Sequence, residues 1–264
     1  MIEPSASKSR KRREEILALL RKQGRFSIQD IVEAFGVSEA TARRDADSLA
    51  QLDGVIRTIG GVQIEGYSAA REASFHEKRQ VLRAEKEAIA ERAVTLVEEG
   101  DIVGLSGGTT TFLIARRLKA MRNITVVTNA VNIAMELADG EGIQTVLTGG
   151  VMRSNSYELC GPLAEKTLEH LNITKMFLGI DGFTIEQGFT TYSELEAQIG
   201  RLMISRAART IAVFDRSKLD RASLFTIVPL SAVHACITNA PLDDRYREAL
   251  EQCGIELHLV GTPS

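Results

Sequence analysis

The sequence predicts an α/β protein with two parts: an N-terminal winged helix-turn-helix and a larger C-terminal domain built on a mostly parallel sheet. The first part is indicated by three short amphipathic segments, followed by a β-favouring segment that turns at Gly60-Gly61. The second is indicated by short β-favouring runs that alternate with helical stretches from residue 80 onward, a pattern typical of a parallel sheet with helices on both faces. We expect domains over 1–64 and 80–264, joined by a linker over 65–79.

Composition excludes several classes of protein. The 264 residues are 44% hydrophobic and 25% charged, with a formal net charge of −3, which is ordinary for a soluble protein. No apolar run approaches the roughly 18 residues needed to span a bilayer, and no apolar signal segment follows the N-terminus. Three widely spaced cysteines, Cys160, Cys236 and Cys253, do not suit a disulfide framework or a zinc cluster. We expect a reduced, cytoplasmic protein without membrane association, cofactor or metal.

The N-terminal segment is basic and helical. Between Lys8 and Arg25 there are eight basic residues and two acidic ones; alone this could be a solvated tail, but beside a DNA-binding motif it favours phosphate contacts. A helix is predicted over 13–23. Ser27, followed three residues later by an acidic residue, has the pattern of a helix N-cap, and Ser38 begins the next helix.

The third helix has the pattern of a recognition helix. Ala42, Ala46 and Leu49 share an inner face, and their small size permits close helix packing. Arg43 and Arg44 lie on the outer face, where arginine can bind phosphate or read guanine in the major groove. The following segment, 55–64, predicts a two-stranded wing. The residues expected at DNA are Ser27, Ser38, Glu39, Ala40, Thr41, Arg43, Arg44, Asp47, Arg57 and Thr58. A small helical bundle with incidental arginines is the alternative.

In the second part, polar and glycine-rich loops follow the predicted strands. Residues 106–111, SGGTTT, follow a strand and open a helix, whose N-terminus favours an anion. Further loops of this kind are 128–129, 148–150, 181–182 and 215–218. Because parallel α/β sheets bind ligands at the carboxyl ends of their strands, these loops predict a ligand site at one edge of the sheet. Taken singly, each loop could equally be a tight turn.

Two sets of motifs resemble the DeoR family of bacterial regulators. The helix-turn-helix signature of that family falls on Arg12, Ile16, Leu20, Ser38, Thr41, Arg43 and Asp45. The motifs SGGTTT, VVTNA, LTGG, GPLAE, GIDGF, GFTT, ELEAQ and DRSK resemble its C-terminal sensor domain. The resemblance implies a repressor that binds double-stranded operator DNA under the control of a phosphorylated sugar. It also implies a sensor fold related to ribose-5-phosphate isomerases. Because one small helix-turn-helix reads few base pairs, we also expect a homo-oligomer, a dimer or a tetramer.

By this resemblance, effector-binding roles fall on Gly108, Thr109, Thr110, Asn129, Gly149, Gly150, Asp181, Glu196 and Lys218. The loop pattern itself adds Gly107, Thr111 and Arg153. The chain departs from the family at Ser106 and Asn239, where aspartate is usual, and at Ala46 and Ile59.

An enzyme is the main alternative, because Asp181, Glu196 and Lys218 are capable of acid–base chemistry. A related fold does not establish activity, however, and Ser106 lacks the usual carboxylate, so we expect a binder that does not turn over its ligand. The four histidines show no metal-ligand spacing. A thiol sensor and an RNA-binding or purely structural module are less favoured readings.

Overall fold

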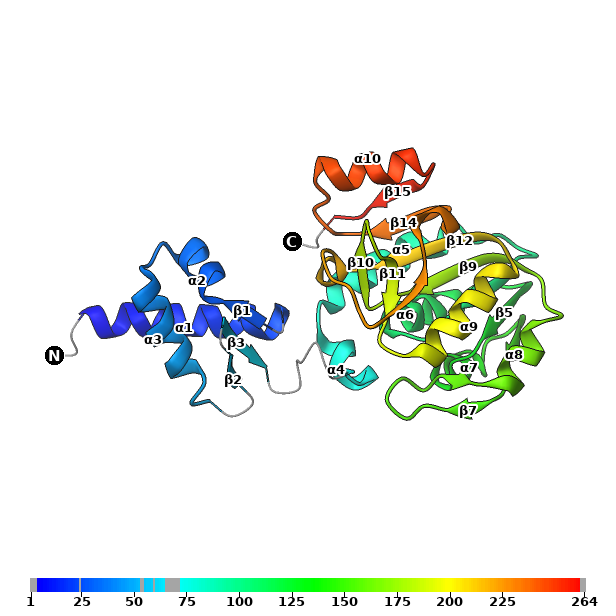
Figure 1. The fold of residues 1–264 in the computed structure, drawn as a ribbon. Helices are drawn as coiled ribbons and strands as arrows, with labels where there is room; N and C mark the ends of the chain where they lie inside the picture. Colours follow the sequence, from blue (N-terminus) through cyan, green and yellow to red (C-terminus); the bar gives the residue numbers. More distant parts are fainter. Residues whose placement is uncertain (1–3, 24, 53–54, 59, 65–71, 262–264) are drawn as a thin grey trace. The chain divides into compact units, whose positions relative to one another are not determined.

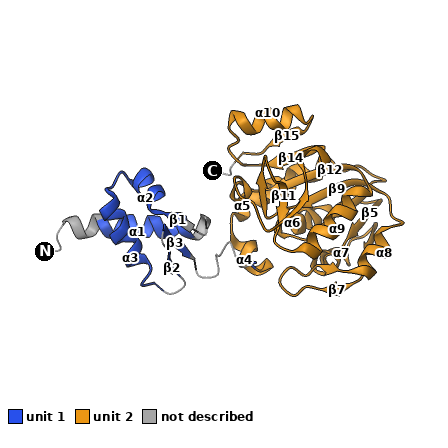
Figure 2. Ribbon diagram, viewed as in Figure 1, with its two compact units in different colours: residues 1–73 blue, residues 74–264 orange. Residues whose placement is uncertain are grey.

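The computed structural model describes residues 4–23, 25–52, 55–58, 60–64 and 72–261. For residues 4–8, 21–23, 25 and 64 only the backbone is described. The chain divides into two compact units, Met1–Ala73 and Ser74–Ser264 (Figure 2).

The first unit contains three helices at the predicted places, α1 (Pro4–Gln23), α2 (Ile28–Phe35) and α3 (Glu39–Leu49). Helix α1 ends where predicted but begins nine residues before the predicted start at Arg13. Ser27 caps α2 in a capping box with Asp30, and Ser38 caps α3 by accepting a hydrogen bond from the Thr41 amide. Gly36 has φ +60°, the left-handed conformation that a tight turn between helices needs. The buried core comprises Ile16, Leu20, Phe26, Ile28, Ile31, Ala42, Ala46, Leu49, Val55 and Val62. The inner face predicted for α3 is therefore confirmed.

The wing has three strands where the sequence predicts two. Strands β2 (Val55–Thr58) and β3 (Gly61–Ile64) form the expected hairpin, and β1 (Arg25–Ser27) pairs with the other side of β3. Phe26 opposes Val62 in this register, and both are buried. This pairing needs glycine at position 61. An added Cβ there would overlap the Phe26 carbonyl and lie 2.7 Å from Ser27 Cα. A three-residue strand is too short to stand out by hydrophobic alternation.

The second unit is built on a seven-stranded, fully parallel sheet in the order β15-β14-β12-β9-β4-β5-β6. Its strands are β4 (Ile102–Leu105), β5 (Ile124–Thr128), β6 (Ile143–Leu147), β9 (Ile173–Gly179), β12 (Ala207–Phe214), β14 (Ala235–Thr238) and β15 (Glu256–Leu259). The predicted parallel sheet is confirmed, and β5 and β6 have the predicted limits.

Helices cover both faces of this sheet (Figure 1). One face packs on α5 (Arg83–Val94), α6 (Thr109–Leu118) and α7 (Val131–Leu137), whose buried residues join Val103, Phe177 and Val213 in one core. The other face packs on α8 (Pro162–Leu168), α9 (Glu194–Ser205) and α10 (Asp244–Gln252), in a second core that includes Met176 and Phe214. Phe177 and Met176 are neighbours in β9, so the two cores follow from the alternation of side chains across a strand.

Two smaller antiparallel pairings sit beside the main sheet. Strands β10 (Gly182–Thr184), β11 (Gly188–Thr191) and β13 (Phe225–Val228) form one small sheet, and β7 (Val151–Met152) pairs with β8 (Leu159–Cys160). Short 3-10 turns, η1 (Arg216–Lys218) and η2 (Leu230–Ala232), follow β12 and β13. These strands are not predicted from the sequence. The β10–β11 hairpin places Thr190 and Thr191 beside the end of β9.

The boundary of the second unit differs from the predicted linker of 65–79. Residues 65–71 lie outside the described residues, but the second unit begins at Ser74 and its first helix is α4 (Phe75–Gln80). Ser74 and Glu77 form a capping box, and Phe75 is buried against Phe112 and Tyr157 with ring centroids 5.6 and 5.7 Å away. Six residues are too few for periodicity to reveal a helix, so the sequence pattern does not predict α4.

Within the described part of the chain, no helix has the length and apolar character required to cross a bilayer. The same residues contain no group of three histidine, cysteine or carboxylate side chains placed to hold a metal ion. The three cysteines are free, with Cys160 and Cys236 buried and Cys253 exposed.

Candidate functional site

The outer face of α3 is exposed as the sequence predicts. Ala40, Arg43, Arg44 and Asp47 are all exposed, and Thr41 is half-buried. Arg43 forms an ion pair with Glu39 one turn earlier, at 2.5 Å. The Arg44 carbonyl accepts a hydrogen bond from the Ser48 hydroxyl, but its guanidinium has no hydrogen bond or ion pair with the described residues. Its five donors are therefore available for a partner outside this chain.

Ion pairs hold α3 against its neighbours. Arg12 Nε on α1 donates to Asp45 Oδ2 at 2.6 Å, and Asp45 is buried. Arg57 Nε on the wing donates to Asp47 Oδ1 at 2.6 Å, and Arg57 also donates to the Gly61 carbonyl at 2.6 Å. Arg57, expected to face DNA, thus also joins the wing to α3. The basic side chains of Lys8, Arg21, Lys22 and Arg25, and residue Ile59, lie outside the described residues.

The ligand-site geometry of the second unit begins with its strand order. Successive strands β4, β5 and β6 extend the sheet in one direction, and β9, β12, β14 and β15 extend it in the other. The connections therefore diverge between β4 and β9, and ligands of such sheets bind outside the carboxyl ends at this point. Ser106 bridges the two strand ends: its Oγ accepts a hydrogen bond from the Gly179 amide at 2.9 Å. The Ser106 side chain thus joins the ends of β4 and β9.

The glycine-threonine loop lies at this point of divergence. Gly108 has φ +132° and precedes α6, so its conformation suits glycine. Thr109 and Thr110 are buried in the first turn of α6. The Thr111 hydroxyl donates to the Gly108 carbonyl at 3.1 Å. Thr111 thus stabilises the loop itself, and the backbone amides at the start of α6 remain the donors that suit an anion.

Two lysines converge on Asp181, which follows β9. Lys78 Nζ on α4 lies 2.7 Å from Asp181 Oδ1, and Lys218 Nζ on η1 lies 3.8 Å from the same oxygen. Burial alone would raise the pKa of Asp181, but the two ammonium groups outweigh it and hold that pKa well below its ordinary value. Burial lowers the pKa of Lys218, which Asp181 and Asp215 oppose. Asp181 is therefore an ionised group held between cations.

Glu196 extends this cluster from α9. Its carboxylate pairs with Arg153, and its Oε2 accepts a hydrogen bond from the Thr191 hydroxyl at 3.0 Å. The same hydroxyl lies 3.2 Å from Asp181 Oδ2. Burial raises the pKa of Glu196 against the opposing charge of Arg153, and the nearby Asp181 carboxylate raises it further. Arg153, Asp181 and Glu196, predicted separately, therefore belong to one network.

Glu158 brings a further buried acid to the cluster. Its Oε2 accepts a hydrogen bond from Asn129 Nδ2 at 2.9 Å, at the end of β5. Burial raises the pKa of Glu158 well above its ordinary value, and the Glu196 charge adds to this. An added Cβ on Gly107 would overlap the Glu158 side chain. Asn129 Oδ1 is buried and has no hydrogen-bond partner among the described residues.

Lys86 connects α5 to the end of β12. Its Nζ lies 3.6 Å from Asp215 Oδ2, and both side chains are almost fully buried. Burial lowers the pKa of Lys86 to about 8, with Asp215 opposing the shift. Asp215 also accepts hydrogen bonds from the Ser217 amide and hydroxyl, which shapes the turn that carries Lys218. The Asn239 side chain accepts a hydrogen bond from the Arg216 amide at 3.0 Å.

Gly149 and Gly150 follow β6, at the same edge of the sheet, where the carboxyl ends of the strands lie. This edge is called the rim below. Both glycines have positive φ, +75° and +115°, and an added Cβ on Gly150 would lie 2.7 Å from the Cys160 carbonyl oxygen. The close approach of β8 therefore requires glycine at position 150, whereas an added Cβ on Gly149 meets nothing within 4 Å. The structure gives neither glycine a contact with the charged cluster.

Three residues of the cluster are not among those predicted from the sequence. Lys78 lies in the segment taken as linker, Glu158 in an irregular loop, and Thr191 in a short strand of the small sheet. Lys78 and Glu158 join the cluster through partners 103 and 29 residues away in sequence, Asp181 and Asn129. Thr191 joins it through Asp181 and Glu196, which are 10 and 5 residues away. The capping box at Ser74 was a local signal that could have revealed α4.

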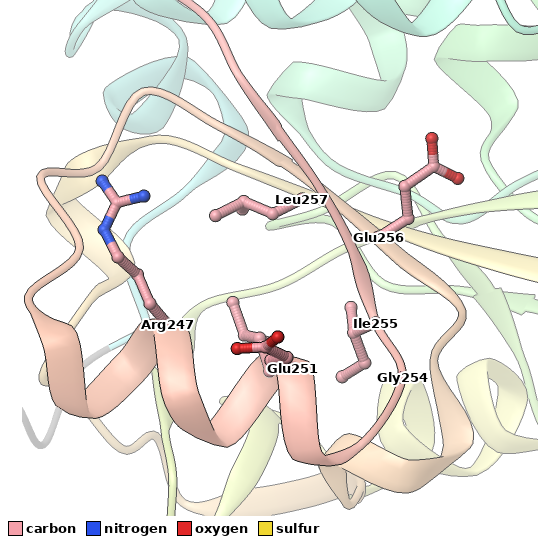
Figure 3. Close-up of a pocket in the computed structure, with 7 residues that line it drawn as sticks. Arg247, Glu251, Gly254, Ile255, Glu256 and Leu257 are labelled. Carbon is pink, nitrogen blue, oxygen red and sulfur yellow. The ribbon is translucent and has the colours of Figure 1, made fainter.

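A separate pocket of about 310 Å³ lies between α10 and β15, at one edge of the sheet (Figure 3). Arg247 and Glu251 reach it from α10, and Glu256 and Leu257 from β15. Arg247 Nε donates to the Leu242 carbonyl, and Glu256 pairs with Arg209. None of the predicted effector residues lines this pocket, and its charges are of both signs, so it does not compete with the rim as an anion site.

A helix-turn-helix followed by an α/β sensor defines a class of DNA-binding regulators, and comparison with known proteins identifies the family. The model described as the DeoR-like helix-turn-helix domain matches residues 12–66, and the DeoR C terminal sensor domain matches residues 82–240. The chain belongs to the DeoR family. It is 35% identical to the HTH-type transcriptional regulator GlpR of Haloferax volcanii, over 92% of this chain and 95% of that protein.

Other relatives carry similar names. The chain is 32% identical to the transcriptional repressor AccR of Agrobacterium fabrum, over 87% of this chain and 89% of that protein. It is 31% identical to the HTH-type transcriptional repressor GlcR of Bacillus subtilis, over 92% and 93%. Since these relatives are named regulators over nearly their whole length, the prediction of a regulator and not an enzyme is confirmed.

Among solved structures, ribose 5-phosphate isomerase A from Methanocaldococcus jannaschii resembles the chain with a TM-score of 0.39 and 19% identity, over 51% of this chain and 53% of that chain. A likeness of this size carries no information about the ligand.

Proposed function

We propose that the protein represses an operon of carbohydrate metabolism by binding operator DNA through α3 and the wing, and that a phosphorylated sugar bound at the rim of the second unit controls this binding. The observation that carries the effector half is the meeting of Lys78 and Lys218 at Asp181 Oδ1, at the point where the strand connections diverge. The DNA half is supported by the exposed arginines of α3 and by family membership.

Charge makes a phosphate the preferred ligand of the rim. A phosphate dianion accepts hydrogen bonds from backbone amides at the N-terminus of α6 and is attracted by the ammonium of Lys218. A neutral sugar uses few of these donors. The buried acids Glu158 and Glu196 and the Asn129 amide suit the hydroxyl groups of the same molecule, because they can accept or donate hydrogen bonds in a site away from water.

We further propose that residues 1–64 suffice for operator contact, that residues 80–264 together with α4 hold the effector, and that the regulator acts as a homo-oligomer in the cytoplasm, where its DNA lies. The DNA contacts proposed are those of the outer face of α3 and of Arg57 and Thr58 on the wing. Ser27 and Ser38 cap α2 and α3, so contacts of theirs with phosphate would come in addition to a structural role.

One titration tests both halves. The wild-type protein first selects an operator fragment from genomic DNA, and a thermal-shift screen over ribose 5-phosphate, glucose 6-phosphate, fructose 6-phosphate and fructose 1-phosphate identifies a ligand, because a bound ligand raises stability by mass action. Operator affinity is then measured by fluorescence anisotropy with and without that sugar phosphate. Arg44→Ala should weaken operator binding by about 1–3 kcal/mol without loss of fold.

The Lys218→Ala variant should bind operator but respond weakly to the sugar phosphate, since the DNA-binding unit is unchanged. Coupling between effector and operator is typically about 5–150-fold in affinity. Lys166→Ala, at an exposed site on α8, is the matched control. An equal response of the wild type to the unphosphorylated sugar, or an unchanged response of Lys218→Ala, would show that the anion site is misplaced.

A further inference from the structure

The helix α4 is the first element of the second unit, and the chain reaches the helix-turn-helix unit only through the residues before it. Its position therefore determines where the connecting segment leaves the sensor. Any effector that changes DNA affinity through this connection has to prefer one placement of α4 over another.

The neighbours of α4 are parts of the effector rim. Phe75 and Arg79 contact the Phe112 ring of α6, the helix that begins with the glycine-threonine loop. The Phe75 amide donates to the Asn155 carbonyl at 2.7 Å, and His76 Nε2 lies 2.8 Å from the Tyr157 hydroxyl. Those two residues belong to the loop between Arg153 and Glu158, both of which point into the charged cluster.

The third contact of α4 is charged. Lys78 extends from α4 to Asp181, where it is the shorter of the two lysine contacts, 2.7 Å against 3.8 Å for Lys218. The backbone of the same residue is also held, because Lys86 Nζ donates to the Lys78 carbonyl at 2.7 Å. Lys86 is in turn paired with Asp215, next to Lys218. The end of α4 is thus tied to the rim by a side-chain ion pair and by a backbone hydrogen bond.

We propose that Lys78 is an anion-binding residue of the effector site and that its exchange between Asp181 and a bound phosphate transmits effector binding to the segment leading into the helix-turn-helix. This inference rests on the proposed function. Asp181 supplies the negative charge that holds Lys78. A phosphate dianion between Lys78 and Lys218 competes with that carboxylate for the same ammonium group, and Lys78 moves with α4.

The test needs no effector, because cutting the ion pair from either end imitates release of Lys78. Operator affinity is measured for Lys78→Met, Asp181→Asn, the double variant, Lys78→Arg and the exposed control Lys166→Met. Each single variant should shift operator affinity in the same direction by about 5–150-fold. The double variant should shift it no further than Asp181→Asn alone, since both changes remove the same ion pair between Lys78 and Asp181. Lys78→Arg should stay close to wild type, and Lys166→Met within about twofold.

Amide hydrogen exchange over residues 75–80 gives a second readout. It should rise in Lys78→Met and Asp181→Asn and stay unchanged in Lys78→Arg, because arginine restores the ion pair. If Lys78→Met does not fold, Asp181→Asn and Lys78→Arg still decide the question from the other side of the pair. Operator affinities within twofold of wild type in the folded single variants, or shifts that add in the double variant, would overturn the inference.

The two proposals fail in different ways. If the single variants are silent while the wild type still responds to glucose 6-phosphate or another member of the panel, the effector site stands and the role of Lys78 falls. If the wild type responds to no phosphorylated sugar although the variants shift operator affinity, the ion pair controls DNA binding and the assigned effector class falls.

Discussion

The Glu158 side chain packs so closely against Gly107 that no larger residue fits at position 107. Any side chain at Gly107 would overlap Glu158, and Glu158 Oε2 accepts a hydrogen bond from Asn129 Nδ2. A carboxyl group held this way in a buried site favours its neutral form, which is why its pKa is raised by burial and by the nearby Glu196. Asn129 Oδ1, buried without a partner among the described residues, is then an acceptor that a sugar hydroxyl can satisfy.

The raised pKa of Glu158 predicts a pH-dependent cost. The folded protein holds a proton on Glu158 at pH values where the unfolded chain, with its ordinary pKa near 4.5, has released it. Stability from this group is therefore present at low pH and is lost as pH rises toward the folded-state pKa, by up to about 1.4 kcal/mol per pH unit. Glu158→Gln keeps the shape without the ionisation. Its melting temperature relative to wild type should rise as pH increases from about 4.5.

Calorimetry of the two proteins at several pH values checks this, with Glu169→Gln at an exposed position on the same unit as the matched control. A difference between Glu158→Gln and wild type that stays constant across the range would contradict the neutral buried carboxyl. The opposite slope would indicate that Glu158 is held ionised by a cation.

Single residues of the site were predictable where a motif carries them. Asp181, Glu196 and Lys218 lie in the motifs GIDGF, ELEAQ and DRSK, which carry the resemblance to the family, and all three lie in one cluster. Lys78 and Glu158 were not predictable, because what gives each of them a role is a partner far away in the sequence, Asp181 in one case and Asn129 in the other. The local sequence pattern does not show which distant residues pair.

At the scale of elements, the parallel strands of the main sheet were the easiest to predict. Ile124–Thr128 and Ile143–Leu147 are continuous β-favouring runs between polar loops, and both are strands over those residues. The antiparallel additions, β1 on the wing and β10, β11 and β13 beside the sheet, have three or four residues each. A strand of that length shows at most two alternations, so it forms because of its tertiary neighbours and not because of its own pattern.

The wing sheet depends on one glycine. A Cβ at Gly61 would overlap the carbonyl of Phe26 and lie 2.7 Å from Ser27 Cα, both of them backbone atoms that cannot rotate away. Gly61→Ala should therefore separate β1 from β3 and destabilise the first unit by about 1–3 kcal/mol, the usual cost of overpacking. Operator affinity should fall with it, since β3 pairs with β2, the strand that carries Arg57.

Gly60 provides the comparison, because an added Cβ there meets nothing within 4 Å. Gly60→Ala should leave both the melting of the first unit and operator affinity close to wild type. Thermal unfolding of residues 1–73 within the full chain and anisotropy on the operator measure both. If Gly61→Ala proves as stable as Gly60→Ala, the close approach of β1 to β3 does not hold in solution.

At the scale of the whole molecule, the number of base pairs that one recognition helix contacts limits the specificity of a single copy. A single α3 of eleven residues presents Arg43 and Arg44 to one stretch of major groove, which specifies few base pairs. Discrimination of one operator among the many competing sites of a genome needs more contacts than this. Two copies on repeated half-sites supply them without any new type of contact, and they place the two recognition helices on one side of the duplex.

We therefore predict a homo-oligomer whose operator contains two half-sites with centres about 34–36 Å apart or at a multiple of this distance, which is one or more turns of DNA. Light scattering should give more than one chain per particle, free and on DNA. Inserting about 5 base pairs between the half-sites turns one of them to the opposite side of the duplex, so affinity should drop, and inserting about 10 should restore much of it because the half-sites face the same way again. A particle of one chain that binds an isolated half-site as tightly as the full operator would contradict this arrangement, as would affinity that does not depend on the phase of the insertion.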